Sequence, residues 1–124
     1  MNKQIESYLP RAINIIIDVG IANDGVVDSR FNGYFSAFGA SIIMSGVKPA
    51  LSFYSNEKVV DDRSKILSAI FALITDIDSV NDVKPQKLLS YYIQNEDDKM
   101  VKYKILNAAV ALKLAVRTYK LEQI

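Results

Sequence analysis

The sequence contains no cysteine and no histidine among its 124 residues. Without cysteine the chain can form neither a disulfide scaffold nor a thiol nucleophile, and zinc sites built from cysteine and histidine are excluded as well. The absence of histidine removes every imidazole general base. These two absences therefore exclude the enzyme classes that depend on thiol or imidazole chemistry.

The chain also lacks a strong net charge and a recognisable leader. Its formal net charge is only +1, so the overall charge balance does not indicate a nucleic-acid partner. Asn2, Gln4 and Glu6 stand where a secretory signal would have a basic start and an apolar run, so we expect a cytoplasmic protein. The uncharged stretch 31–47 contains too many polar and small residues to cross a bilayer, so we expect no membrane partner.

Catalytic motifs are scarce too. Carboxylates cluster at 61–62, 76–78 and 96–98, which are predicted helix ends or connectors, where acidic side chains ordinarily cap helices or face solvent. The glycines between residues 33 and 46 lie in a helical pattern and lack the spacing of a phosphate-binding loop. We therefore expect a protein that is not an enzyme, with no metal site, no cofactor and no small-molecule substrate.

The residues that are present predict one helical domain. Half of them are hydrophobic, and the chain is long enough for a single core, so we expect one domain over 1–124. Apolar residues recur at spacings of three and four in most segments, and we find no strand pair. The predicted fold class is an all-α bundle of five to six helices, which cover approximately residues 2–22, 31–46, 47–54, 62–77, 85–95 and 97–123.

The stretch 31–47 is central to this prediction, because it contains no charged residue and is therefore expected to be buried. Phe31, Phe35 and Phe38 recur at helical spacing, and Ile42 and Ile43 continue the same stripe. The residues between them are small, and we expect them to let a neighbouring helix approach closely. These small residues are Gly33, Ser36, Ala37, Gly39, Ala40 and Ser41.

Gly46 is predicted to end this helix, because glycine adopts the left-handed backbone conformation that closes a helix with little strain. Pro49 then falls in the first turn of a second helix, where its missing N–H is harmless. The stretch 31–54 therefore predicts a helix, a glycine corner and a short helix.

This corner and its flanks resemble the central motif of the small helical subunit of the type III-B (Cmr) CRISPR RNA-silencing complex. The residues that carry the resemblance are FGASIIMSGV at 38–47, ALSFY at 50–54 and the charged pair Glu57-Lys58. The family pattern is Leu-Pro, apolar residues that include Ile, a small polar residue, Gly-Leu, and Leu-Ala-Phe before Ser-Lys. This chain departs from the pattern at Gly39, at Val47 and at Glu57.

The resemblance implies a non-catalytic structural subunit of an RNA-guided effector complex in antiviral defence. Such a subunit stacks in several copies along the groove that holds the guide RNA and the target RNA. Its partners would be copies of itself and the large and backbone subunits of the complex. Its own contribution would be a basic surface that contacts the RNA backbone and leaves base identity to the guide.

A basic segment in the last quarter of the chain suits such a surface. Residues 99–120 include six lysine and arginine residues and no acidic residue. Lys113, Arg117 and Lys120 are spaced by four and three, so in a continuous helix they would form one stripe that can neutralise phosphates. The predicted RNA-binding residues also include a second set at the ends of the central helices, which consists of Arg30, Lys48 and Lys58.

The charge pattern also has a simpler explanation. Cations favour the carboxyl ends of helices and solvated helix faces in proteins that never meet nucleic acid. The alternative hypothesis is therefore a helical protein-interaction adaptor with no nucleic-acid role. Salt sensitivity distinguishes the two, because phosphate contacts weaken steeply as the salt concentration rises and an apolar adaptor interface does not.

Overall fold

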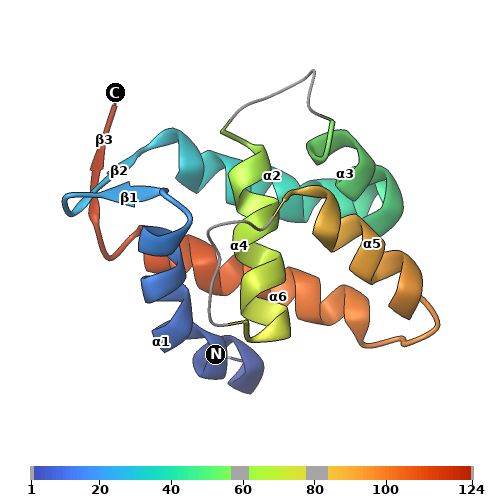
Figure 1. Ribbon diagram of the computed structural model, residues 1–124. Helices are drawn as coiled ribbons and strands as arrows, with labels where there is room; N and C mark the ends of the chain where they lie inside the picture. The colour runs from blue at the N-terminus through green and yellow to red at the C-terminus, as the bar shows by residue number, and fades with distance from the viewer. Residues whose placement is uncertain (1, 57–61, 78–83, 124) are drawn as a thin grey trace.

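A computed structural model describes residues 2–56, 62–77 and 84–123 (Figure 1). These residues form six helices and three short strands, so the predicted all-α bundle of five to six helices is confirmed. No helix among them is long and apolar enough to cross a membrane. The helices are α1 (Lys3–Asp18), α2 (Arg30–Ser45), α3 (Val47–Tyr54), α4 (Ser64–Thr75), α5 (Gln86–Asn95) and α6 (Val101–Val116), and the strands are β1 (Ala22–Asn23), β2 (Val26–Asp28) and β3 (Lys120–Glu122).

Helix α6 lies at the centre of the bundle and packs against α1, α2 and α4 (Figure 1). The buried side chains of α6 are Val101, Ile105, Ala108, Ala109, Ala111, Leu112, Ala115 and Val116. Half of these are alanines, and small side chains shorten the distance at which helices pack. Three helices can therefore share α6 as a common partner.

The three strands form a small sheet at one end of the bundle, in the order β1-β2-β3 (Figure 1). β1 and β2 are an antiparallel hairpin whose turn residues, Asp24 and Gly25, both have positive φ, as two-residue hairpin loops favour. β3 pairs in parallel with β2, so that Val27 lies opposite Leu121. The expectation that the chain has no strand pair is wrong, because strands of two or three residues are too short to show an alternating pattern.

Strand β3 also shortens the last helix. We expected a helix over 97–123, but α6 ends at Val116, and residues 117–119 turn the chain into the sheet. Tyr119 Oη donates a hydrogen bond to the Ile13 carbonyl oxygen of α1 at 3.0 Å. This hydrogen bond holds the turn after α6 against the first helix. A continuous helix over 97–123 would place Tyr119 elsewhere.

Helix α2 is buried on one face only. Its buried side chains are Phe31, Phe35, Phe38 and Ile42, as the predicted stripe required. Ile43 and Met44 are instead 73% and 84% exposed, so the expectation that the whole of 31–47 is buried is wrong. Because α2 packs mainly against α6 and α3, these neighbours cover one side of the helix and leave the other at the surface.

Gly46 separates α2 from α3, as predicted. Its φ of 94° is positive, but its ψ of 166° lies outside the left-handed helical region and in a region that is essentially restricted to glycine. Pro49 lies in the first turn of α3, as predicted. The corner therefore depends on glycine through an unusual backbone conformation rather than through an ordinary helix cap.

Candidate functional site

The predicted stripe of Lys113, Arg117 and Lys120 does not form on one helix. Lys113 lies in the last turn of α6 and Arg117 is its C-cap residue, so these two remain four residues apart on one side of the helix. Lys120 belongs to β3, and its Nζ lies 2.9 Å from Glu122 Oε1. The sheet therefore separates Lys120 from the other two cations.

Lys113 and Arg117 are the predicted RNA-binding residues that remain available. Neither takes part in an ion pair within the described parts of the chain. Helix α6 itself contains no acidic residue, and Arg117 is exposed while Lys113 is half-buried. The carboxyl end of a helix carries a partial negative charge, which favours cations there even without a ligand.

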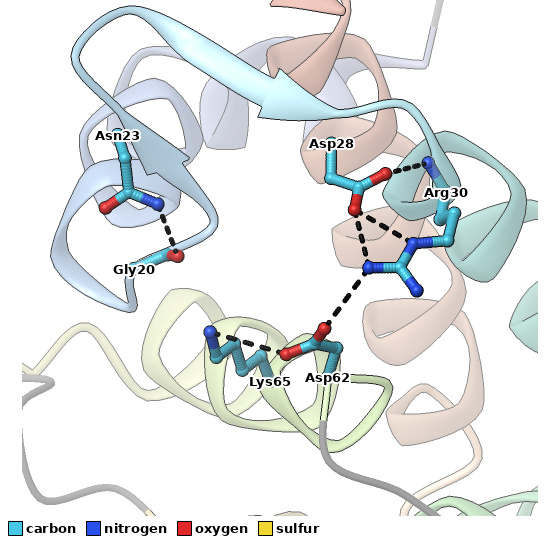
Figure 2. Close-up of polar contacts among 6 residues, drawn as sticks. All are labelled: Gly20, Asn23, Asp28, Arg30, Asp62 and Lys65. Carbon is cyan, nitrogen blue, oxygen red and sulfur yellow. Dashed lines mark hydrogen bonds and ion pairs between the residues drawn. The ribbon is translucent and has the colours of Figure 1, made fainter. Parts of the chain in front are cut away.

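Arg30 is held by acidic neighbours at the junction of β2 and α2 (Figure 2). Its Nε and Nη2 donate to Asp28 Oδ2 at 2.9 and 2.6 Å, and its Nη2 also lies 3.6 Å from Asp62 Oδ2. Asp28 Oδ1 accepts the backbone N–H of Arg30 at 3.0 Å, which caps the first turn of α2. The hydrogen bonds from Arg30 hold the pKa of the Asp28 carboxyl below its usual range.

This cluster joins three elements rather than forming an open anion site. Asp62 Oδ1 also lies 3.6 Å from Lys65 Nζ, so each of the four charged groups has an opposite charge as a neighbour (Figure 2). A recess of about 240 Å³ lies beside the cluster, and on its far side Asn23 Nδ2 donates to the Gly20 carbonyl oxygen at 3.2 Å. The balanced charges link the hairpin, α2 and the start of α4, and they leave no net positive charge for a phosphate.

The other two predicted residues are not gathered with Lys113. Lys48 Nζ lies 3.4 Å from Glu96 Oε2, at the contact between α3 and the end of α5. Lys58 lies outside the described residues. The structure thus brings together two of the predicted cations, Lys113 and Arg117, and places Lys120, Arg30 and Lys48 in separate ion pairs.

Sequence reasoning missed the exposed side of α2, which we call the α2 outer face. It consists of the residues of α2 between positions 31 and 44 that are exposed, which are Gly33, Ser36, Ala37, Ala40, Ile43 and Met44. None of these is charged, although a surface helix ordinarily carries charged residues on the side that faces solvent. No heavy atom lies within 4 Å of a Cβ added at Gly33 or Gly39, so no neighbouring helix among the described residues approaches these two glycines closely. The lack of charge in 31–47 was the signal for this face, and burial was the wrong interpretation of it.

A groove runs between α2 and α6 beside the α2 outer face, and we call it the α2–α6 groove. It has a volume of about 390 Å³ and is lined by Phe35, Ser36, Gly39 and Ile43 from α2 and by Leu106, Ala109, Val110 and Lys113 from α6. Lys113 is the one charged residue in this lining. The groove can therefore hold an apolar group and place it next to a single cation.

Comparisons with known proteins add no family to this picture: no protein-family model, curated protein or solved structure matches the chain. The described residues also contain no group of three or more acidic side chains positioned to hold a metal ion. Two features support a functional argument: the cations at the end of α6 and the α2–α6 groove.

Proposed function

We propose that this chain is a non-catalytic structural subunit of a type III-B CRISPR (Cmr) effector complex. In this role it stacks in several copies along the groove that holds the guide RNA and the target RNA, beside the large and backbone subunits, in antiviral defence. The resemblance of residues 38–58 to the small subunit's central motif supports the proposal. The observation that carries the RNA contact is the pair Lys113 and Arg117, unpaired within the described residues, on a helix without acidic residues.

The charge arrangement suits contact with an RNA backbone rather than with bases. Lys113 and Arg117 lie one turn apart, about 6 Å along the helix axis, so they can reach neighbouring phosphates. Phosphate contacts position a protein without reading sequence, as a subunit beside a guide requires. Two contacts in one copy bind weakly, but stacked copies repeat the same pair along the strand and raise the effective concentration of each contact.

The test is target-RNA binding by a reconstituted complex over a salt series. Lys113→Glu with Arg117→Glu should lower RNA retention and flatten the salt dependence, by a slope of about 2 for each copy if both cations neutralise a phosphate. Lys84→Glu with Lys87→Glu is the matched control, because these exposed lysines precede and begin α5 and the change in net charge is the same. Subunit stoichiometry is measured in every sample. Equal affinities and equal salt slopes for the two double variants would refute RNA contact at the end of α6.

One observation favours the alternative, a helical protein-interaction adaptor with no nucleic-acid role. The α2 outer face offers no cation to an RNA backbone, and exposed apolar side chains such as Ile43 and Met44 are typical of protein interfaces. Under this alternative the double variant with Lys113→Glu and Arg117→Glu assembles as the unmodified chain does. No RNA copurifies with the unmodified chain or with the double variant. RNA copurification that is lost at high salt therefore separates the two hypotheses.

A further inference from the structure

The two walls of the α2–α6 groove run in opposite directions. Strand β2 leads into α2, and α6 leads into β3, and these strands pair in parallel. Helix α2 therefore leaves the sheet and α6 returns to it, as Figure 1 shows. Phe35 and Lys113 lie at the end of the groove near the sheet, and Ile43 and Leu106 lie at the far end.

From this geometry we infer that the α2–α6 groove binds an amphipathic helix of a protein partner whose flanks carry acidic residues. The inference goes beyond the proposed RNA contact, because it concerns another class of partner and a surface that is largely uncharged. Its first support is shape. Lining residues recur at 35, 39 and 43 on α2 and at 106, 109/110 and 113 on α6, so the groove follows both helices for about two turns, or about 12 Å.

The small lining residues let a third helix come close. Ser36, Gly39 and Ala109 provide little side-chain bulk at the middle of the groove, and the neighbouring Ala40 is equally small. The distance between packed helices falls when the contact residues are small. A partner helix with apolar anchors at i, i+3 or i+4, and i+7 matches a groove of this length and depth.

The charges beside the groove indicate that the flanks of the partner helix are acidic. Neither α2 nor α6 contains an acidic residue, and Lys113 lies at the sheet end of the groove. Lys102 is exposed one turn before Leu106 on the same side of α6, so a second cation lies near the far end. Acidic residues on the flank of a docked helix would meet both cations, whereas basic residues there would be repelled.

Other occupants fit these observations less well. A two-fold pair of this chain would place the same face of each copy together, so that the charged side chains brought to the interface would all be cations. A nucleic-acid strand would find no cation on the α2 wall and would leave Ile43 and Met44 exposed to water. A bilayer surface binds protruding apolar side chains, whereas the α2–α6 groove is recessed at Gly39.

The probe is a synthetic helical peptide of about 18 residues, long enough to form a helix, with leucines at i, i+4 and i+7 and glutamates on both flanks. Its control is the same peptide with lysine in place of every glutamate. We expect the acidic peptide to bind the full chain at low salt, in fluorescence anisotropy, at least about tenfold more tightly than the basic one. The preference should shrink as salt screens the exposed charges.

The chain offers a matched pair of variants. Gly39→Leu fills the groove, and Gly33→Leu makes the same change on α2 outside the groove lining; a Cβ meets no atom within 4 Å at either position. We expect Gly39→Leu to weaken the acidic peptide by about tenfold or more and Gly33→Leu to change its affinity by less than about twofold, with both proteins folded by circular dichroism.

A second variant keeps the test independent of groove filling. Lys113→Glu should weaken the acidic peptide and strengthen the basic one, because it reverses the charge in the lining. Equal binding of the two peptides, or equal effects of Gly39→Leu and Gly33→Leu, would overturn the inference. A concentration-dependent dimer that Gly39→Leu abolishes, or binding of anionic vesicles or RNA that depends on Gly39 in the absence of peptide binding, would also overturn it. None of these results contradicts the RNA proposal, and RNA binding that depends on Gly39 would extend it.

Discussion

Gly46 provides a direct test of the corner between α2 and α3. A Cβ added to this glycine would have Pro49 Cδ as its nearest atom, at 3.8 Å, which is ordinary van der Waals contact. Gly46→Ala therefore introduces no collision, and its cost arises from the backbone alone. A residue other than glycine in such a backbone conformation lowers the stability of the fold by about 1–3 kcal/mol. Gly46→Val should lose more, because a β-branched side chain is harder to place at positive φ.

This cost converts into a measurable change in melting temperature. A chain of 124 residues has an unfolding entropy of about 0.26 kcal/mol per kelvin, from about 2.1 cal/mol per kelvin for each residue. Gly46→Ala should thus lower Tm by roughly 4–12 °C. Gly33→Ala is the control, because Gly33 lies within α2 without a positive φ and alanine there should stabilise the helix by about 0.5–1 kcal/mol.

The assay is thermal unfolding followed by circular dichroism, with both variants and the unmodified chain at equal concentration. The two alanine substitutions should shift Tm in opposite directions. Shifts of the same sign and size would show that the conformation of Gly46 is not required, and the corner on which the family resemblance depends would then carry no structural constraint.

Two further predictions concern the core and the ion-pair cluster. Phe38→Ala should lower the free energy of unfolding by about 3–5 kcal/mol, because Phe38 is fully buried. Phe53→Ala should lower it by less than about 1 kcal/mol, because Phe53 is half exposed. Similar urea midpoints for the two variants would contradict this prediction. Arg30 lowers the pKa of Asp28 in the folded state, so ionised Asp28 stabilises the fold. This contribution is complete above the pKa of Asp28 in the unfolded chain, and it is lost as the pH falls through the lower pKa of Asp28 in the folded chain. Below about pH 4 the unmodified chain should therefore lose stability more steeply than Asp28→Asn, and parallel curves would rule out the linkage.

The helices could be predicted because their signals are local. Apolar residues three and four apart placed α1, α2, α4, α5 and α6 within the chain, and Gly46 marked the corner, since one residue with positive φ suffices to end a helix there. The sheet could not be predicted in this way. Val26 pairs with Lys120, and no pattern within either short segment specifies so distant a partner.

The candidate site shows the same difference between local and distant signals. Lys113 and Arg117 are neighbours because both belong to one helix end, so their spacing predicted their arrangement. Lys120 was assigned to the wrong element, because the end of α6 depends on the sheet that follows. The α2 outer face was misjudged for another reason: a run without charge is equally compatible with a buried helix and with a contact surface, and only the position of the neighbouring helices distinguishes them.

The central place of α6 also has a consequence during protein synthesis. Helices α1, α2 and α4 leave the ribosome before α6 exists, so their buried faces have no common partner until the segment 101–116 emerges. Contacts between distant segments form late and slowly, and exposed apolar faces favour aggregation while they wait. A nascent chain stalled before residue 101 should accordingly be a ligand for chaperones, and release of the α6 segment should end that dependence.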